Sequence, residues 1–308
     1  MRVMTWNVEN LFGLGGPAGV TTQPALDQKL ANIASKIAEH DPDAVALQEV
    51  GDPAALDDLM AQPALAGFAH KTVSDYPDTA PGHAIRVAFL SKLEPIAIGQ
   101  LRDFPPNGIT CVEQEGGTLQ RLGRGALSIT VPIGGENVRL VTLHLKSKLL
   151  TYPGGRFSPH DENERARVGG YALFRRAAEA VAVRVWANEM LNASQDPLIV
   201  LGDLNDVPEA ATTQILYGPS DLDLQRKDKG DPWRLVNLAR FLPEGDQFSR
   251  TYHHEKELID HILATTALAR RNVSIVSDIE HVTSIGDQPR ERKNAVWPDH
   301  APVVATID

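Results

Sequence analysis

Short apolar runs alternate along this chain with segments of helical periodicity, and Gly and Pro mark the joints between them. We interpret the apolar runs as β-strands. The predicted strands are Val3–Val8, Ala44–Leu47, Ile85–Leu90, Ala126–Val131, Val138–Leu145, Leu198–Leu201, Leu258–Leu263, Val273–Val276 and Pro302–Ile307. Strands and helices that alternate in this way, without an internal repeat, predict one α/β domain over residues 1–308.

Two segments have the spacing of three and four residues that is typical of an amphipathic helix. The first has apolar residues at Leu26, Leu30, Ile33 and Ile37. The second has them at Tyr171, Phe174, Ala178, Val181 and Val185, with Arg175, Arg176 and Arg184 on other faces. We expect the apolar stripe of this second, longer helix to pack on a sheet. Stretches without periodicity are predicted to be loops that carry substrate contacts, namely Gly13–Pro24, Arg102–Gly125, Thr151–Glu162 and Asp221–Asp231.

The composition limits the function more than the fold. With 308 residues, 42% of them hydrophobic, the chain can bury a large core. A formal net charge of -10 argues against a broad cationic surface for sequence-independent binding to duplex DNA, although it is compatible with a local basic groove. The single cysteine, Cys111, excludes an intramolecular disulfide. No stretch reaches the ~20 apolar residues that span a bilayer, so we expect a soluble, cytoplasmic protein that does not bind membranes. We also expect it to be a monomer.

Polar residues end the first two predicted strands. Asn7 ends the first in Thr-Trp-Asn-Val-Glu-Asn, and Glu49 ends the second in Ala-Leu-Gln-Glu-Val. A carboxylate at a strand end can bind a hard cation such as Mg²⁺, which takes oxygen ligands. Taken alone, either residue would more often be a surface polar group or a turn former, so their weight comes from the strand ends that follow.

The strand Val138–Leu145 continues into a basic segment, His-Leu-Lys-Ser-Lys. Because side chains alternate along a strand, His144, Lys146 and Lys148 share one face, which is positive enough to meet a phosphate. A lone histidine at a strand end is more often a hydrogen-bonded structural residue, but the two lysines favour a phosphate contact.

The strand Leu198–Leu201 leads into Gly-Asp-Leu-Asn-Asp, which places Asp203 and Asn205 on one side. An acid and an amide at this spacing can orient a water molecule and hold a phosphate oxygen. An ordinary Asx turn is an equally good interpretation of these two residues by themselves.

An acidic residue, Asp260, lies inside the apolar run Leu258–Leu263. An ionised carboxylate there needs a partner to offset its loss of solvation. His300, which follows Asp299 just before the last strand, is the natural candidate, because a carboxylate on one ring nitrogen strengthens the other nitrogen as a base. Prolines on both sides of Asp299-His300 favour an irregular turn that could present both side chains.

Six motifs, taken in order, resemble the signature of the endonuclease/exonuclease/phosphatase superfamily. They are Thr-Trp-Asn-Val-Glu-Asn, Leu-Gln-Glu-Val, Thr-Leu-His-Leu-Lys-Ser-Lys, Leu-Gly-Asp-Leu-Asn-Asp, Leu-Ile-Asp-His-Ile-Leu and Pro-Asp-His-Ala-Pro-Val. Each motif alone is weak, whereas the ordered set spans essentially the whole chain. The resemblance implies an α/β fold that is a four-layer αββα sandwich, with two mixed β-sheets face to face and helices outside. It also implies Mg²⁺ or Mn²⁺ as cofactor, held mainly by Glu49, with Asn7 and Asp299.

The same resemblance implies roles for the remaining polar residues. Asp203 would orient or deprotonate the attacking water, and Asn205 would bind the scissile phosphate. His300 paired with Asp260 would act on the phosphate or as the base, and His144 would stabilise developing charge or assist the leaving oxygen. Which of Asp203 and His300 removes the proton is left open by the sequence.

In one respect the sequence departs from the family pattern. Nuclease-like members can pair a histidine at the position of His144 with a carboxylate from the strand equivalent to Ile85–Leu90, but here that strand contains no acid. The partner of His144 is therefore open, and Arg86 is a candidate substrate contact.

The motifs resemble bacterial nuclease-like members more than inositol phosphatases, so we expect hydrolysis of a phosphodiester, with DNA and RNA as candidate substrates. The predicted substrate-binding cations are Lys146, Arg124, Arg165 and Arg167, although any one arginine could instead be solvated or paired with an acid. A small phosphorylated metabolite or a lipid headgroup is the alternative substrate and suits the acidic net charge better. A catalytically inactive binding protein on the same fold is disfavoured, because the set of polar residues is complete.

Overall fold

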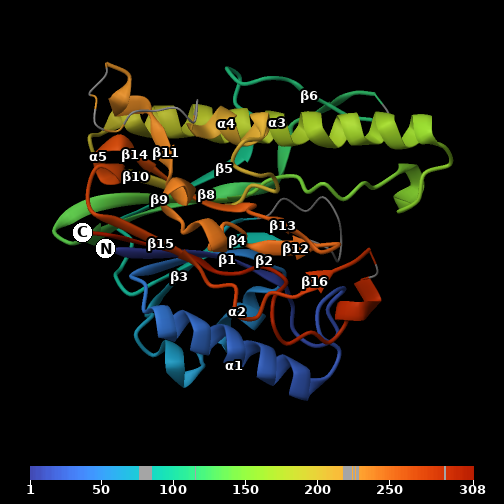
Figure 1. The fold of residues 1–308 in the computed structure, drawn as a ribbon, viewed down its shortest axis with the longest axis horizontal. Coiled ribbons are helices and arrows are strands. Elements are labelled where there is room, and N and C mark those ends of the chain that lie inside the picture. Colours follow the sequence, from blue (N-terminus) through green and yellow to red (C-terminus); the bar gives the residue numbers. More distant parts are fainter. Residues whose placement is uncertain (76–84, 115, 218–223, 225, 227–228, 288) are drawn as a thin grey trace.

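Two six-stranded mixed β-sheets lie face to face in the computed structural model, with helices on their outer faces (Figure 1). The structure describes residues 1–75, 85–114, 116–217, 224, 226, 229–287 and 289–308. The longest helix, α3 (Glu162–Ala193), lies along one outer face and α1 (Gln23–His40) along the other. This order of layers confirms the predicted αββα sandwich.

The first sheet has the strand order β15-β17-β1-β2-β4-β3. These strands are β15 (Val273–Ser277), β17 (Val303–Ile307), β1 (Arg2–Leu11), β2 (Ala44–Val50), β4 (Arg86–Ser91) and β3 (His70–Val73). β1 and β2 pair in parallel, and the other pairs are antiparallel. On the outer face, beneath α1 and α2 (Pro53–Met60), the predicted helix residues Ile33 and Ile37 pack with Trp6 and Leu47 of the sheet.

The second sheet has the strand order β11-β14-β10-β9-β8-β5. These strands are β11 (Leu235–Asn237), β14 (Asp260–Thr265), β10 (Leu198–Asp203), β9 (Glu136–His144), β8 (Arg121–Ile133) and β5 (Ala97–Asp103). β9 and β10 pair in parallel, and the other pairs are antiparallel. The outer face carries α3 and α4 (Ala211–Tyr217), where Val183 and Leu191 of α3 pack with Val141 and Leu198 of the sheet.

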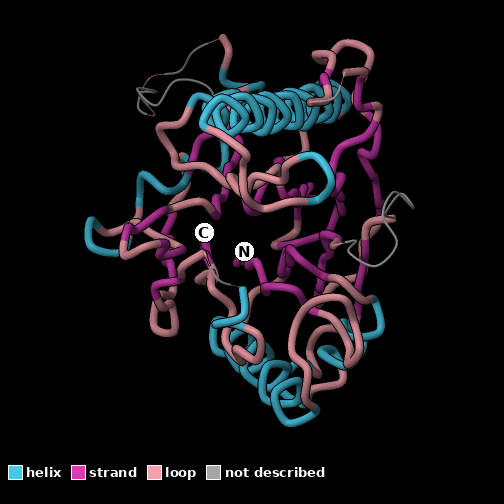
Figure 2. Tube along the Cα trace, turned by 90° about the vertical axis from the view of Figure 1, so that its right-hand side faces the viewer, coloured by secondary structure: helices cyan, strands magenta, loops and turns pink. Residues whose placement is uncertain are grey.

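The space between the sheets is filled by apolar side chains from both, among them Phe89, Leu127, Ile199 and Ile262. Both faces of the central strands are therefore buried, which explains why runs such as Ala44–Leu47 are continuously apolar. The two ends of the chain meet at the same side of the molecule (Figure 2). There the amino group of Met1 donates to the carbonyl oxygen of Ile307 at 2.8 Å.

Shorter elements complete the fold. β12 (Arg250–Tyr252), β13 (Glu255–Glu257) and β16 (Ser284–Ile285) form a three-stranded sheet, and β6 (Cys111–Val112) pairs with β7 (Thr118–Leu119). The short helix α5 spans Thr266–Ala269. The 3₁₀ helices are Pro63–Leu65, Pro153–Gly155, Asp231–Trp233, Leu238–Phe241, Glu244–Asp246 and Pro289–Arg292.

Each run that the sequence predicts as a strand overlaps one, and the strands that bear polar residues run on beyond their apolar part, β1 to Leu11 and β10 to Asp203. The predicted loop Arg102–Gly125 is wrong in part, because it contains β6, β7 and the start of β8. β6 and β7 have two residues each, too few to show an alternating pattern. The predicted loop Asp221–Asp231 lies partly outside the described residues, at 221–223, 225 and 227–228.

The buried face of α3 also differs from the predicted one. Tyr171, Phe174, Val181 and Val185 are only half-buried, whereas the side of the helix toward the sheet carries small alanines and two charged residues, Arg176 and Glu179. Arg176, which the periodicity placed on another face, is 5% exposed. Although α3 has 32 residues, neither it nor another helix of the described chain has an apolar stretch long enough to cross a membrane.

Candidate active site

Asp203, the last residue of β10, lies between two other ionisable residues of the second sheet. In the strand registers it stands beside His144 of β9 and opposite Asp260 of β14. The preceding Gly202 has a φ of 154°, and a Cβ there would clash with the carbonyl oxygen of Leu143 on β9. The strand therefore needs glycine at this point to bring Asp203, which is 1% exposed, into place.

Asn7 connects the two sheets at this end of the sandwich. Its side-chain nitrogen Nδ2 donates to Asp203 Oδ2 of the second sheet at 3.0 Å and to Glu49 Oε1 of its own sheet at 3.2 Å. Glu49 is half-buried, whereas Asn7 is 1% exposed. The predicted strand ends of β1, β2 and β10 are thus joined by one amide group.

A bulge in β1 directly after Asn7 shapes this contact. Glu9 and Asn10 have φ values of 48° and 53°, and Glu49 on the neighbouring strand has 63°, all in the left-handed region that non-glycine residues rarely adopt. The backbone amide of Glu9 donates to Asn7 Oδ1 at 3.0 Å, and that of Asn10 donates to Glu49 Oε2 at 2.9 Å. Strained backbone of this kind gathers at functional sites, where the surrounding contacts hold it.

Two cations hold the bulge, the buried Lys29 and the half-buried Arg292. Arg292 makes two hydrogen bonds of 2.6 Å to the carboxylate of Glu9, and Lys29 donates to the carbonyl oxygen of Glu9 at 2.5 Å. Burial lowers the pKa of Lys29, while the carboxylates of Glu9, Glu49 and Asp299 oppose that fall. Glu49 and Asp299, the two carboxylates that the sequence nominates as metal ligands, thus both act on the charge of Lys29.

His300 and Asp260 form the pair that the sequence predicted. His300 Nδ1 and Asp260 Oδ2 are 2.7 Å apart, and Ser249 Oγ donates to the same oxygen at 2.6 Å. The other oxygen, Asp260 Oδ1, has no hydrogen-bond partner among the residues that the structure describes. Burial opposes the charge on His300, but the carboxylates of Asp260, Asp299 and Asp203 outweigh it and raise the pKa of His300 to about 10. Its ring is therefore protonated at neutral pH.

The surroundings of Asp203 disfavour its charged form, whereas those of His300 favour the charge on the ring. Burial, and then the charge of Asp260, raise the pKa of Asp203 to about 7, although His300 and the hydrogen bond from Asn7 act in the other direction. A carboxylate poised near neutrality is suited to exchange a proton with water.

His144 on β9 lies on the other side of Asp203 from Asp260. Its Nε2 lies 3.3 Å from Asp203 Oδ2, and its Nδ1 has no hydrogen-bond partner within the described part of the chain. Burial, followed by the cations Arg124, His300 and Lys146, holds the pKa of His144 well below its usual value, so the ring is neutral. Asp203 is thus the carboxylate that lies beside His144. Arg86 instead donates to the carbonyl oxygen of Gly51 at 2.9 Å.

The remaining two predicted catalytic or metal-binding residues are Asn205 and Asp299. The backbone amide of Asn205, whose φ is 53°, donates to Asp203 Oδ1 at 2.8 Å, and its side chain donates to the carbonyl oxygen of Leu145 at 3.0 Å. Asp299 Oδ2 lies 3.5 Å from Nε of Arg250. Burial opposes the ionisation of Asp299, yet neighbouring cations led by His300 and Arg250 hold its pKa below the usual range.

The four predicted substrate-binding cations divide into two groups. Arg124 donates to the carbonyl oxygen of Leu145 at 3.0 Å and Lys146 to that of Leu149 at 2.6 Å, and both act on the pKa of His144. Arg165 instead pairs with Glu162 on the exposed side of α3, and Arg167 is exposed. Within the described residues, no hydrogen bond or ion pair joins the latter two to the cluster.

Several residues that build this site could not be recognised from the sequence. Ser249, Arg250, Lys29 and the Glu9–Arg292 pair have no motif of their own, and their partners lie far away along the chain. A signal was present only for Glu9, as part of Thr-Trp-Asn-Val-Glu-Asn. Contacts of this kind become visible only when the fold is known.

A sequence profile of the Endonuclease/Exonuclease/phosphatase family matches residues 4–284. The chain belongs to this family. Its members are metal-dependent phosphoesterases and nucleases. The residues grouped around Asp203 come from the sequence motifs that resemble this family. No protein with a curated description matches the sequence.

Solved structures of this family have the same fold over nearly their whole length. Truncated TDP2 from Caenorhabditis elegans is 18% identical with a TM-score of 0.58, and the alignment covers 99% of this chain and 96% of that one. The 3' phosphatase NExo from Neisseria, bound to a product DNA hairpin, is 20% identical with a TM-score of 0.58, covering 100% and 99%. A mannosyl-6-phosphatase from Bacteroides thetaiotaomicron is 14% identical with a TM-score of 0.59, again covering 100% and 99%. At these identities the likeness establishes the fold alone.

The charges at the site fit the divalent metal that enzymes of the Endonuclease/Exonuclease/phosphatase family use. Single ligand atoms of Asp203, Asp260 and His300 lie within 4.8 Å of one another. Of these groups, the two carboxylates offer the oxygen atoms that suit a hard cation, whereas His300 is protonated and paired with Asp260. The partnerless oxygen Asp260 Oδ1 and the raised pKa of Asp203 both show an excess of negative charge that a bound cation would relieve.

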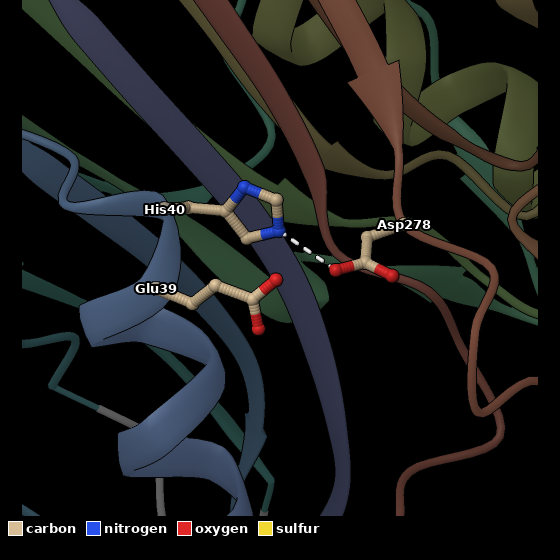
Figure 3. A group of neighbouring side chains, drawn as sticks. All are labelled: Glu39, His40 and Asp278. Atoms are coloured by element: carbon tan, nitrogen blue, oxygen red, sulfur yellow. Dashed lines mark hydrogen bonds and ion pairs between the residues drawn. The ribbon is translucent and has the colours of Figure 1, made fainter.

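A second acidic cluster lies where Glu39 and His40, at the end of α1, meet Asp278 (Figure 3). His40 Nε2 lies 2.8 Å from Asp278 Oδ2. The ammonium group of Lys36 lies 2.9 Å from Glu39, Asp278 and Glu280, so this cluster already has its cation. We interpret it as a structural ion-pair network.

Proposed function

We propose that this protein hydrolyses a phosphodiester, with nucleic acid as the substrate, in a reaction that depends on Mg²⁺ or Mn²⁺ and uses water as the nucleophile. The observation that carries the proposal is the position of Asp203. It lies within hydrogen-bond or ion-pair reach of Asn7 and His144, and in register with Asp260, which holds His300. Four segments far apart in the sequence thus bring proton-exchanging groups to one point.

Glu49 and Asn7 would hold the metal, with Asp299 as a further ligand. Glu49 is suited to this role because it is half-buried, and its two oxygens are oriented by Asn7 and by the backbone amide of Asn10. When bound, a divalent cation supplies Lewis-acid chemistry by neutralising charge on the phosphate oxygens.

The protein's own groups divide the proton transfers between them. With a pKa raised to about 7, Asp203 accepts a proton from the attacking water, which assigns it the role of general base. His300, which stays protonated because of Asp260, stabilises negative charge on the phosphate from its Nε2 side. Neutral His144 donates a hydrogen bond to developing charge or to the leaving oxygen. Asn205 binds a phosphate oxygen with its second amide hydrogen.

A polymeric phosphodiester as substrate is supported by two observations. Arg124 and Lys146 place positive charge beside His144, where the phosphate next to the scissile bond would lie. Among structures of the same fold, NExo is described with a bound DNA hairpin product.

A small phosphorylated metabolite is the second candidate substrate. The formal net charge of -10 disfavours long contacts with a nucleic acid backbone, and a mannosyl-6-phosphatase shares the fold. Arg165 and Arg167 lie away from the cluster, which shortens the cationic track that a nucleic acid could follow.

The test is a substrate panel with Mg²⁺ or Mn²⁺. It compares bis-p-nitrophenyl phosphate, p-nitrophenyl phosphate, single- and double-stranded DNA, RNA, mannose 6-phosphate and phosphoinositides, with and without EDTA. We expect diester hydrolysis that EDTA abolishes and added metal restores, and a KM for nucleic acid that rises steeply with salt. Hydrolysis of monoesters alone would favour the metabolite, and diester hydrolysis that survives EDTA would contradict the proposed reaction.

A further inference from the structure

Two charged side chains of α3 are buried against the second sheet, at a place where a helix usually presents apolar residues. Arg176 is 5% exposed and Glu179 is 2% exposed. The remainder of the buried stripe consists largely of alanines and valines. Arg176 is paired with Asp206 and Glu179 with Arg175. Burying an ion pair stabilises a fold little, because the loss of solvation offsets the attraction between the charges. Another reason for these two residues is therefore needed.

Glu179 accepts hydrogen bonds from two backbone amides, one just after His144 and one on the neighbouring strand β8. Its Oε2 accepts from the backbone amide of Lys146 at 2.7 Å. Its Oε1 accepts from the backbone amide of Gly123 on β8 at 2.9 Å and from Arg175 Nε at 3.1 Å. One carboxylate thus fixes the segment two residues after His144 to the adjoining strand.

Arg176 joins the same segment to the loop after β10. Its Nη1 donates to the carbonyl oxygen of Lys146 at 3.0 Å, and its Nε donates to Asp206 Oδ2 at 3.1 Å. The backbone carbonyl of Asp206 is in turn held by His261 Nε2 at 2.9 Å. His261 is the residue directly after Asp260, so the contacts lead back to the acid that pairs with His300.

Together these contacts leave the end of β9 little freedom. Lys146 is held at its amide by Glu179 and at its carbonyl by Arg176, while the carbonyl of Leu145 accepts from Arg124 and Asn205. Leu145 also donates from its backbone amide to the carbonyl of Asp203 at 3.0 Å. β9 ends at His144, whose ring lies 3.3 Å from Asp203, and these contacts hold the chain directly after it.

We propose that Glu179 and Arg176 are positioning residues, which act from α3 through the main chain of Lys146 to hold His144 beside Asp203. The inference deepens the proposed phosphodiesterase function and rests on it for the kinetic part of its test. A displacement of ~1 Å in a catalytic group can lower turnover ~10²-fold, so a buried network that fixes one has an effect on rate out of proportion to its effect on stability.

The variants are Glu179→Gln, which keeps the size of the side chain, and Arg176→Lys, which keeps the charge and removes the fork of donors. The control is Glu189→Gln, on the exposed side of the same helix. We expect kcat to fall about tenfold in each of the first two variants and to be unchanged in the control. The Mg²⁺ concentration for half-maximal activity should stay the same, since the proposed ligands Asn7 and Glu49 belong to the other sheet.

A double-mutant cycle separates positioning from a general structural role. If Glu179 acts through His144, then Glu179→Gln should cost less than about twofold in protein that already carries His144→Ala. A cost that remains about tenfold in that background would overturn the inference. So would failure of both Glu179→Gln and Arg176→Lys to fold, as judged by circular dichroism, because the network would then serve the fold itself.

The ring signals of His144 in isotope-labelled protein test the same placement without turnover. Glu179→Gln should shift them and Glu189→Gln should not, and unshifted signals in the first variant would overturn the inference whatever the activity. If the wild-type protein cleaved no substrate of the panel while the His144 signals moved as expected, the proposed function would fail and the positioning role of Glu179 would stand.

Discussion

Asp203 and Asp260 stand directly opposite each other on the neighbouring antiparallel strands β10 and β14. Both are 1% exposed, so two carboxylates share a space from which water is excluded. His300 compensates one of them, and a divalent cation would compensate the rest. The site is thus built with an excess of negative charge, and this excess has consequences for stability, for pH dependence and for metal binding.

The first prediction concerns stability in the absence of metal. The pKa of Asp203 is raised from 3.8 to about 7, so the folded protein binds a proton there that the unfolded chain releases. The raised pKa therefore destabilises the fold progressively as the pH rises from 3.8 to 7, and fully above 7. We expect Asp203→Asn to be more stable than the wild type by ~1–2 kcal/mol at pH 8 and equally stable near pH 4, while losing activity. Thermal unfolding at both pH values measures this, with the exposed Asp103→Asn as control. A variant that was less stable at pH 8 would show that the carboxylate is compensated within the protein.

A second prediction concerns Glu49, the principal candidate metal ligand. Glu49→Ala should lower turnover by roughly 10²–10⁴ and leave the melting temperature nearly unchanged, because the side chain is half-buried. His300→Ala should lower turnover by a similar factor but also the melting temperature, since it leaves Asp260 buried without its partner. Steady-state kinetics and thermal unfolding distinguish the two variants, with Glu94→Ala at an exposed position as control. Wild-type turnover in Glu49→Ala would remove this residue from the site.

The third prediction concerns the pH dependence of turnover. Activity should rise as Asp203 loses its proton, at or below pH 7, and fall as His300 loses its own near pH 10. Asp260 raises both pKa values, so Asp260→Asn should move both limbs of the profile to lower pH, in addition to lowering the maximum. The profile of kcat against pH for the two proteins measures this. Limbs that stay in place would show that other groups control the rate.

The strand ends could be predicted from the sequence because a polar residue directly after an apolar run is a local signal. Asn7, Glu49, His144 and Asp203 were all found in this way, and the structure brings them to one edge of the sandwich. The pairing of Asp260 with His300 could be inferred because an acid inside an apolar strand requires a partner.

The remaining parts of the site depend on contacts between distant segments. The left-handed backbone at Glu9 and Asn10 could not be predicted from the sequence, because neither residue is the glycine that usually marks this conformation. The helix face that carries Arg176 was misassigned because the hydrophobic pattern counts charged residues as exposed, and here two of them bond to backbone groups of the sheet. Arg165 and Arg167 follow loop residues in the sequence, yet the helix that begins at Glu162 turns them to its exposed side.

The last prediction concerns Gly202, which no side-chain argument would select. Because a Cβ at this position would clash with the carbonyl oxygen of Leu143, Gly202→Ala must push β10 away from β9 at the point where Asp203 meets His144. We expect a loss of at least ~2 kcal/mol in the free energy of unfolding, together with a loss of turnover. Gly134→Ala is the matched control, since Gly134 has a φ of 63° but nothing within 4 Å of the added carbon. It should lose ~1 kcal/mol through its backbone alone and keep full activity. Chemical denaturation and kinetics on both variants measure the difference, and equal losses of stability would mean that the close approach of the two strands is not what requires glycine before Asp203.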